Sequence, residues 1–256
     1  AIEMLSQIFS MPEHIYKDVT DFEHNDYNMN SVGTGPYKLV DYQSGSYLKF
    51  EANENYYKGE PSIKNVVFQI IENADTAILA LQNGAVDAYQ MTPQQVKKLD
   101  LDASNLPTYS YSEGRVGYLE INCNRVTDEK VRKALLYAMD RKAMDDAAFE
   151  SSEYYSIPYT FLPTNSQFYT EDGVEKYEQD VDKAKSMLED AGVSGLKLKL
   201  GYMSSDAVQS AQALLIQEQL KEVGVTVELA GGDGTAIANA MKDPDNEYDM
   251  YLGGYI

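Results

Sequence analysis

The feature that most constrains the fold is an alternation of strand and helix patterns over residues 196–255. In the first strand pattern, leucines that include Leu198 and Leu200 alternate with lysines. This alternation is typical of a strand with one buried face and one exposed face. The expected strands cover 196–200, 225–229 and 248–255, and the expected helices cover 204–223 and 234–241. Strands separated by helices of this length run parallel, with right-handed crossovers. The sequence therefore predicts an α/β fold with a mainly parallel sheet.

A further strand and helix are expected in residues 115–141. Residues 117–122 form a short extended run, and Thr127 offers an N-cap for a helix. Apolar residues then recur at helical spacing, so we expect one long helix with a single buried stripe. The stripe consists of Val131, Ala134, Leu135, Ala138 and Met139.

Within the extended run 117–122, alternate side chains share a face of the strand. The apolar pair Leu119 and Ile121 is expected to enter the core. The other face then carries Tyr118, Glu120 and Asn122. These three polar side chains are candidates for contact with a ligand.

The remaining elements follow from turn and cap signals. Asn73 and Thr92 are N-cap residues, and Gly84 offers a helix C-terminal cap. We also expect a hairpin over 37–40 and 47–52, a buried strand over 66–71, a strand over 108–112, an ordered loop over 150–168, and a helix over 180–191 that ends at Gly192. Ser204 or Ser205 is expected to cap the helix that ends near residue 223.

Composition excludes several classes of partner. The chain has 256 residues, enough for one large or two ordinary domains, and a net charge of −20. Such an acidic chain does not fit nucleic acid or an anionic membrane surface. No apolar run is long enough to span a bilayer, and no signal peptide pattern is present. A single cysteine allows no internal disulfide. We read the chain as a piece of a longer exported protein.

No motif specifies an enzyme, a cofactor or a metal. The two histidines, His14 and His24, lie in no metal-binding motif. The loop 231–234 lacks both the dinucleotide fingerprint and the P-loop signature, so a tight turn or the lining of a ligand cleft is expected there. Residues 243–254 lack the glycine and glutamate of a calcium loop. Cys123 has no histidine near it in sequence. We therefore expect no catalysis, no cofactor and no metal.

Several short motifs occur in a specific order. They are G-T-G-P-Y-K-L at 33–39, N-x-x-Y-Y-x-G-x-P at 53–61, A-L-x-x-G-x-x-D at 80–87, V-R-x-A-L-x-x-A-M-D-R at 131–141, A-x-x-x-L-x-x-A-G at 184–192, I-Q-x-Q-L-x-x-x-G-V at 216–225 and Y-D-M at 248–250. In this order they resemble family 5 extracellular solute-binding proteins, the oligopeptide, dipeptide and nickel receptors of ABC importers. Tyr57 stands where tryptophan is common in that family.

The resemblance implies a two-lobe periplasmic-binding-protein-like (type II) fold, in which a hinge motion closes the ligand between the lobes. The chain would hold part of lobe I, lobe II and two strands that cross between the lobes. The implied boundaries are 1–111 for partial lobe I, 112–124 for the crossing strand, 125–247 for lobe II and 248–256 for the returning strand. We expect the two crossing strands to lie side by side at the hinge. The N-terminal and C-terminal parts of lobe I are expected outside this sequence.

The implied function is that of an extracytoplasmic substrate-binding receptor of a bacterial ABC transporter. It would capture oligopeptides or similar small solutes and deliver them to the permease subunits. The alternatives are a surface peptide sensor or adhesin on the same fold, or a receptor for nickel, haem or sugar. The implied state is a monomer at the cell surface or in the periplasm, attached to the membrane only through a lipid anchor outside this sequence.

The candidate ligand site combines two arguments. In open α/β sheets, ligands bind beyond the carboxyl ends of the strands, and the resemblance makes the crossing strands part of the cleft. The resulting ligand-binding candidates are Tyr118, Glu120, Asn122, Tyr202, Ser204, Gly253, Gly254 and Tyr255. Peptide-binding family members carry an aspartate for the ligand's amino group just past a Gly-Trp pair. Gly254-Tyr255 occupies that position here, so the aspartate is expected beyond residue 256.

Overall fold

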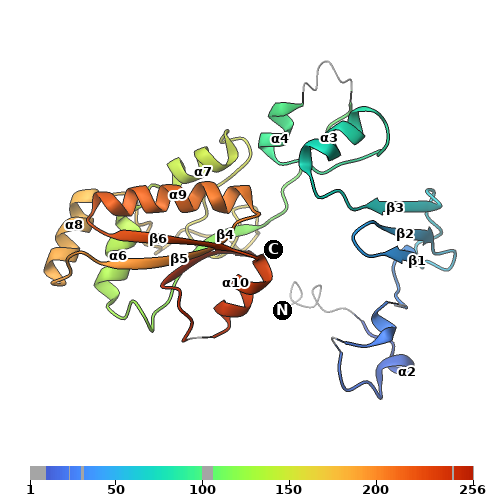
Figure 1. The fold of residues 1–256 in the computed structure, drawn as a ribbon, viewed down its shortest axis with the longest axis horizontal. Coiled ribbons are helices and arrows are strands. Elements are labelled where there is room, and N and C mark those ends of the chain that lie inside the picture. The colour runs from blue at the N-terminus through green and yellow to red at the C-terminus, as the bar shows by residue number, and fades with distance from the viewer. Residues whose placement is uncertain (1–9, 23, 30–31, 100–105, 244, 256) are drawn as a thin grey trace. The chain divides into compact units, whose positions relative to one another are not determined.

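The computed structural model describes residues 10–22, 24–29, 32–99, 106–243 and 245–255 (Figure 1). The chain divides into two compact units, residues 1–90 and 91–256. Both units combine helices with a sheet, as expected for an α/β protein. None of the helices in the described parts is long and apolar enough to cross a membrane.

The first unit is organised around a three-stranded antiparallel sheet in the order β1-β2-β3. Its strands are β1 (Tyr37–Gln43), β2 (Tyr47–Ala52) and β3 (Asn65–Gln69). The hairpin between β1 and β2 confirms the predicted one. The expectation of a buried third strand is wrong, because Val67 and Phe68 are 56% and 60% exposed. Its apolar composition indicated burial, but only the packing around a strand decides whether its side chains are covered.

Two of the sequence motifs meet in this unit. Asn53 is buried, and its side-chain amide donates a hydrogen bond to the carbonyl oxygen of Gly35 at 3.0 Å. The backbone N–H of the same residue donates to the carbonyl of Pro36 at 2.7 Å. The asparagine of the second motif therefore holds the glycine-proline turn of the first, which is a structural role for both.

The described part of the first unit contains the helical segments α2 (Glu13–Tyr16), the 3-10 helix η1 (Asp26–Asn28) and α3 (Ala74–Gln82). As predicted, Asn73 caps α3 by accepting from the N–H of Thr76 at 2.9 Å. Gly84 follows the helix with φ of 74°, a left-handed conformation that glycine adopts without a steric penalty.

The second unit contains a four-stranded mixed sheet in the order β4-β7-β5-β6 (Figure 1). The strands are β4 (Val116–Ile121), β5 (Lys197–Met203), β6 (Thr226–Gly232) and β7 (Met250–Tyr255). Strand β5 pairs in parallel with β6 and with β7, and β4 pairs antiparallel with β7. The mainly parallel sheet is confirmed, and so is the pairing of the segments 117–122 and 250–255.

Six helices accompany this sheet in the described parts of the unit: α4 (Pro93–Lys98), α6 (Glu129–Ala138), α7 (Arg141–Phe149), α8 (Val181–Asp190), α9 (Ala207–Glu222) and α10 (Gly234–Met241). Thr92 forms the predicted cap of α4, as a capping box with Gln95. Residues 106–115 contain no strand, so the expected strand over 108–112 is wrong.

The helix expected after Thr127 ends earlier than predicted: α6 stops at Ala138, and a second helix, α7, begins at Arg141. Met139 has an extended backbone (φ −101°, ψ 129°), and Asp140 caps α7 through the N–H of Ala143. The N-cap of α6 is Asp128, not Thr127, and that of α9 is Asp206, not Ser204 or Ser205. The segments before α6 and α9 each offer several cap residues in a row, and an aspartate carboxylate takes the position both times.

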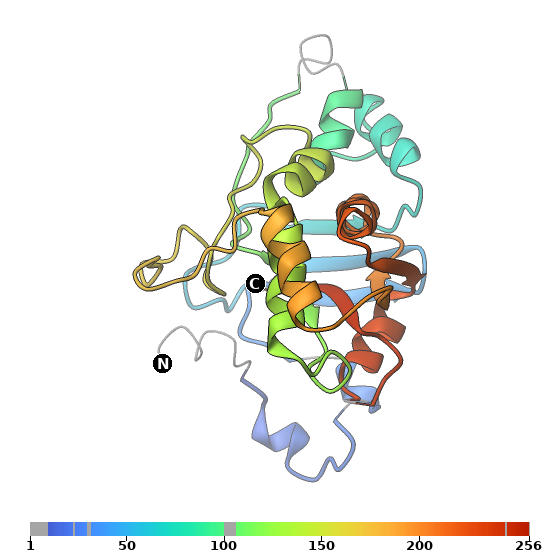
Figure 2. The ribbon, with the colours of Figure 1, turned by 90° about the vertical axis from the view of Figure 1, so that its left-hand side faces the viewer.

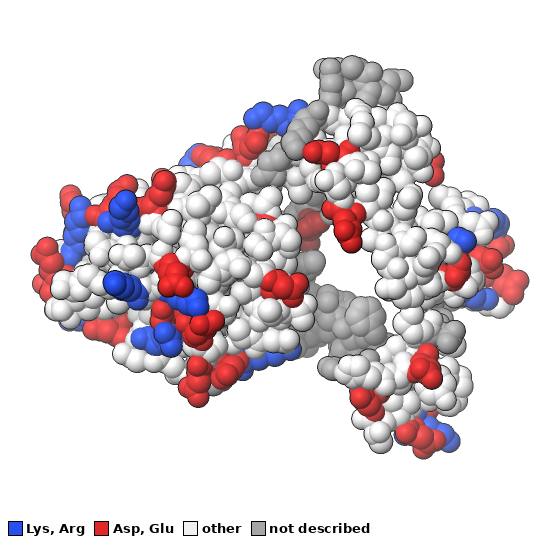
Figure 3. Space-filling model, viewed as in Figure 1, with Lys and Arg blue, Asp and Glu red and all other residues white. Residues whose placement is uncertain are grey.

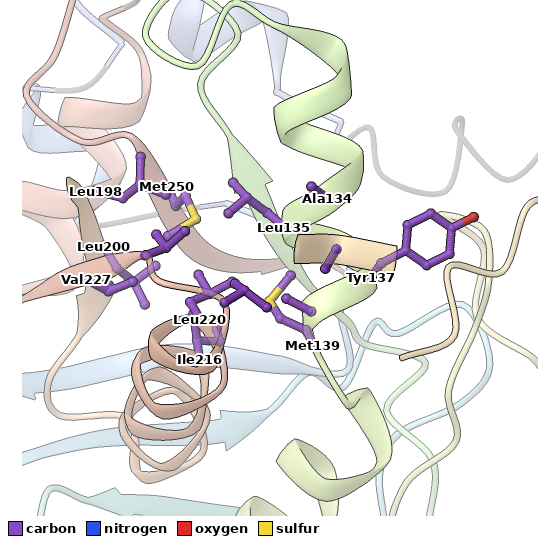
Figure 4. Close-up of a cluster of buried hydrophobic side chains, with 14 of the residues drawn as sticks. Ala134, Leu135, Tyr137, Met139, Leu198, Leu200, Ile216, Leu220, Val227 and Met250 are labelled. Carbon is purple, nitrogen blue, oxygen red and sulfur yellow. The ribbon is translucent and has the colours of Figure 1, made fainter. Parts of the chain in front are cut away.

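The core of the second unit lies between one face of the sheet and helices α6, α8 and α9 (Figures 2 and 4). In Figure 4, Leu198, Leu200, Val227 and Met250 come from the strands, and Leu135, Ile216 and Leu220 come from the helices. The whole predicted stripe of α6 is buried: Val131, Ala134, Leu135, Ala138 and Met139. Leu119 and Ile121 pack against this cluster, as their alternation in β4 predicted.

Asp249 connects three parts of the sheet. Its carboxylate is 2.7 Å from Nε of Arg125 and accepts the backbone N–H of Lys199 at 2.7 Å. Its own backbone N–H donates to the carbonyl of Lys199, and its carbonyl accepts from the N–H of Asn122. Asp249 is 9% exposed, so these charge-assisted bonds are shielded from water.

We expect Asp249→Asn to lower the free energy of unfolding by about 2–3 kcal/mol, because the amide cannot accept from both donors. Urea denaturation at neutral pH measures this. The control is Glu129→Gln, which removes an exposed ion pair with Lys133 on the surface of α6 and should leave the midpoint nearly unchanged. Equal effects of the two substitutions would contradict the role assigned to Asp249.

Asp145 lies between α7 and α9, where Nε2 of Gln212 donates to its carboxylate at 2.9 Å. Burial raises the pKa of Asp145 to about 6, although the bond from Gln212 and the charge of Arg141 act in the opposite direction. Its neighbour Asp146 bonds Lys142 and Tyr155. These bonds lower the pKa of Asp146, with the bond to Lys142 as the largest cause.

The folded state therefore binds a proton at Asp145 more tightly than the unfolded chain does. The stability contributed by this group is greatest below about pH 4 and is lost as the pH rises to about 6. We expect Asp145→Asn to raise the free energy of unfolding by about 1 kcal/mol at about pH 7.5, after discounting for partial exposure, and not at about pH 4. Asp146→Asn, the control, should act in the opposite direction at the higher pH. Urea titrations at both pH values distinguish these outcomes.

Candidate functional site

The carboxyl ends of the three parallel strands lie at one edge of the sheet. Strands β5, β6 and β7 end there, and the antiparallel β4 begins there, because Val116 pairs with Tyr255. Helices α9 and α10 also begin at this edge, directly after β5 and β6. This is the position at which open α/β sheets bind ligands.

The N-termini of these two helices are already capped by aspartates. The carboxylate of Asp206 accepts the N–H groups of Val208 and Gln209, and that of Asp233 accepts those of Thr235 and Ala236. Their charges offset the positive helix ends, which disfavours an anion at the glycine loop 231–234. The expected tight turn at 231–234 is wrong, because Gly231 and Gly232 belong to β6, Asp233 is the N-cap and Gly234 begins α10; cleft lining stays a prediction.

The sheet face opposite the main core carries a row of polar and aromatic residues from β4 and β7: Tyr118, Glu120, Tyr251 and Tyr255. The register pairs Tyr118 with Gly253 and Glu120 with Tyr251, so these side chains share that face. The rings of Tyr118 and Tyr255 lie 5.8 Å apart, tilted by 33°. A Cβ atom at Gly253 would come within 2.6 Å of the Tyr118 ring, so the glycine makes room for the ring.

Hydrogen bonding and burial perturb the tyrosines of this row. Burial is the largest cause that raises the pKa of Tyr251, and the hydrogen bond to the Glu120 carboxylate is the next. Burial and the charge of Glu120 also raise the pKa of Tyr118. Tyr251 is only 4% exposed, whereas Glu120 is exposed. The row therefore presents the accessible carboxylate of Glu120 beside the ring of Tyr118.

The opposite sheet face holds the other predicted residues. Tyr202 pairs with Gly231, and its ring lies against the position that a Cβ of Gly231 would occupy, at 2.9 Å. The hydroxyl of Ser204 donates to the carbonyl of Gly232 at 3.2 Å. Tyr202 packs against the core cluster, so it does not share a face with Tyr118. The structure brings the candidates to one edge of the sheet, but on both of its faces.

Gly254 lies on the same face as Tyr202, beneath the side chain of Arg115. A Cβ at Gly254 would come within 2.8 Å of Nε of Arg115. The guanidinium also forms an ion pair with the α9 cap Asp206 at 3.7 Å. Neither Arg115 nor Tyr251 was among the predicted site residues. The alternation of β7 could have placed Tyr251 on the face of Gly253, but only the strand register pairs it with Glu120.

Asn122 lies at the end of β4, in the turn that leads to α6. Its side-chain oxygen accepts the N–H of Asn124 at 3.0 Å, and its amide donates to the carbonyl of Tyr248 at 3.4 Å. These bonds hold the turn against the segment before β7. A role of Asn122 in ligand binding stays a prediction.

The possible metal ligands are dispersed. No group of three or more His, Cys, Asp or Glu side chains that could hold a metal ion occurs in the described parts of the chain. The ring of His24 lies on the surface, 3.3 Å from the carboxylate of the nearby Asp21. Cys123 is exposed. Acidic and basic side chains are interspersed on the face of the second unit that Figure 3 shows.

Comparison with known proteins places these features in a family. Residues 1–256 match the family model described as bacterial extracellular solute-binding proteins, family 5 Middle. The chain is similar to the ABC transporter substrate-binding protein CtaP of Listeria monocytogenes, with 35% identity and a TM-score of 0.81. That alignment covers 99% of this chain and 52% of CtaP.

Curated relatives show the same relation. The oligopeptide-binding protein AppA of Bacillus subtilis is 29% identical, over 96% of this chain and 48% of AppA. The structure of AppA in complex with a nonapeptide matches with 25% identity and a TM-score of 0.73, over 96% of this chain and 52% of that one. The nickel-binding periplasmic protein of Escherichia coli is 27% identical, over 83% of this chain and 44% of its own.

This chain thus spans about half the length of the relatives that it matches. The structural neighbours are binding proteins of the two-lobe type, in agreement with the fold expected from the motifs. The order of the motifs and the whole-chain match to the family model lead to the same assignment. The chain belongs to the family 5 bacterial extracellular solute-binding proteins.

Proposed function

We propose that this chain forms the middle portion of an extracytoplasmic receptor that captures oligopeptides and delivers them to an ABC permease. The observation that carries the proposal is the match of the whole chain to the family 5 model. The similarity to the oligopeptide-binding protein AppA, whose structure was solved with a nonapeptide, favours peptide over other solutes. The family is one of solute-binding proteins, so the proposed role is binding and delivery rather than catalysis.

The proposed receptor has two lobes, with boundaries at 1–111, 112–124, 125–247 and 248–256 as the motifs imply. Strands β4 and β7 would form the crossing between the lobes, and their antiparallel pairing supports this assignment. The receptor would act as a monomer, at the cell surface as a lipoprotein or in the periplasm. Its ligand would lie against the row that contains Tyr118, Glu120 and Tyr255.

A nickel receptor is the second candidate, because the nickel-binding protein of Escherichia coli is among the relatives. Native mass spectrometry of the ligand that co-purifies with the full-length protein separates the two. A set of peptide masses supports the peptide receptor, and nickel or a nickel chelate supports the alternative. Recovery of neither, with no binding of a peptide library to the full-length protein, would contradict both.

We propose that Glu120 recognises a positively charged group on the ligand. Glu120 is exposed and lies on the sheet face away from the core, where the strand register pairs it with Tyr251. No lysine or arginine forms an ion pair with Glu120 in the described parts of the chain. Its charge is therefore available to an ammonium or guanidinium group of a peptide.

We expect Glu120→Gln in the full-length protein to weaken binding of a tripeptide with a central lysine by about tenfold, the value of one charge-assisted hydrogen bond. Binding of the matched norleucine peptide should change little. Calorimetry with both peptides measures the difference. Glu228→Gln, an exposed glutamate of β6, is the control. Equal losses of affinity for the two peptides would show that Glu120 does not recognise the charge of the ligand.

Gly253→Ala tests whether the ring of Tyr118, in the same row, contacts the ligand. The added Cβ would lie 2.6 Å from the Tyr118 ring, which must then move, whereas a Cβ at the neighbouring Gly117 would meet only the carbonyl of Gly253 at 4.0 Å. We expect Gly253→Ala to weaken peptide binding severalfold with little loss of stability, and Gly117→Ala to leave binding nearly unchanged. Calorimetry gives the affinities and thermal unfolding the stabilities. Unchanged binding in both variants would show that the ring does not contact the ligand.

A further inference from the structure

A pocket lies away from the candidate ligand site, where the start of α7 meets the loop that follows it. Its volume is about 210 Å³, and its walls come from Met139, Asp140, Arg141, Lys142, Ile157, Tyr159, Tyr177, Glu178 and Gln179. All of these residues belong to the second unit. This volume lies below that of a pocket for a drug-sized ligand, so it suits only a small organic molecule.

Two cations converge on one aromatic ring of this pocket. The guanidinium of Arg141 lies 4.6 Å from the centre of the Tyr159 ring, and the ammonium of Lys176 lies 4.5 Å from it. Lys176 is paired with Glu171 at 2.5 Å, and the third nearby cation, Lys142, with Asp146. These two lysine charges are already compensated by carboxylates.

Arg141 differs from both lysines. It forms no ion pair within the described chain, and its guanidinium donates a hydrogen bond to the backbone carbonyl of Lys176. A guanidinium has five N–H donors, so one carbonyl leaves donors for another acceptor. Arg141 is half-buried. A positive group with spare donors thus faces a cavity in a protein of net charge −20.

The acidic residues around the pocket are largely occupied. Asp140 caps α7 through the N–H of Ala143, and Glu175 accepts the hydroxyl of Tyr137 at 2.7 Å. Glu178 is an exposed carboxylate of the wall, and it would repel a ligand with two negative charges. A monoanion therefore fits better than a phosphate.

The remaining wall is apolar and aromatic. Met139 is buried, and Ile157, Tyr159 and Tyr177 are half-buried. Tyr177 has a backbone φ of 45°, a conformation that costs a non-glycine residue of order 1 kcal/mol or more. Its ring packs edge-on against Tyr137 at 5.2 Å, and Figure 4 shows Tyr137 directed away from the centre of the core. The backbone is thus held in a strained form at the wall of the pocket.

We propose that this pocket binds a small aromatic carboxylate, with its carboxylate on Arg141 and its ring against Tyr159 and Tyr177. An arginine fork matches the two oxygens of a carboxylate. Apolar and aromatic walls with a few polar groups are the usual setting for small-molecule sites. The site is separate from the row of Tyr118 and Glu120, and it does not depend on peptide capture.

The test is a titration of the purified protein with sodium benzoate and with benzamide, its neutral counterpart, followed by two-dimensional NMR. We expect benzoate to shift the signals of residues 141, 157, 159 and 177, and to bind at least about tenfold more tightly than benzamide. Arg141→Gln should reduce the affinity for benzoate to that for benzamide. Lys130→Gln, an exposed lysine at the start of α6, is the control and should bind as the unaltered protein does.

A second variant covers the case in which Arg141→Gln disturbs the loop. Tyr159→Leu keeps an apolar side chain but removes the ring, so it should weaken benzoate severalfold while circular dichroism stays unchanged. Equal affinity for benzoate and benzamide would overturn the proposal. So would shifts confined to the row of Tyr118 and Tyr251, or no benzoate binding with a Kd below about 10 mM.

Discussion

The carboxylate of Asp249 is the interaction on which the sheet of the second unit depends. It bonds Arg125 in the turn after β4 and the backbone of Lys199 in β5, while its own backbone bonds Lys199 and Asn122. Asp249 directly precedes β7, so these contacts place β7 between an antiparallel and a parallel neighbour. A residue in this position sets the register of three strands at once, and the register decides which side chains share a face.

That register produces the asymmetry of the candidate site. One sheet face carries Leu119, Leu200 and Leu252, which pack against the helices. The other carries the row of Tyr118, Glu120 and Tyr251, in which glycines stand opposite or beside large rings. Gly253 lies under Tyr118 and Gly201 under Tyr248, where a Cβ would approach the ring to 2.6 and 3.1 Å. Glycines that weaken a strand in isolation here allow aromatic side chains to lie flat on the sheet.

Charge is distributed unevenly between the two proposed sites. The row on β4 and β7 offers an exposed carboxylate and suits a cationic group, in keeping with the acidic character of the whole chain. The pocket beside α7 offers an arginine that forms no ion pair within the described chain, although its charge acts on Asp145, and suits an anion. Helix α7 begins only because Met139 leaves the helical conformation and Asp140 forms a new cap. The break between α6 and α7 thus creates the position of Arg141.

The sequence by itself determined the elements whose signals are local. The apolar stripe of α6, the caps at Asn73 and Thr92, the parallel strands after residue 196, and the family all follow from spacing and order along the chain. Tertiary structure decided the features that depend on distant partners. The exposure of β3, the break after Ala138, the pairing of Glu120 with Tyr251 and the separation of Tyr202 from Tyr118 across the sheet belong to this group. The physical reason is that periodicity reports which side chains of one element share a face, whereas burial and register depend on what that face meets.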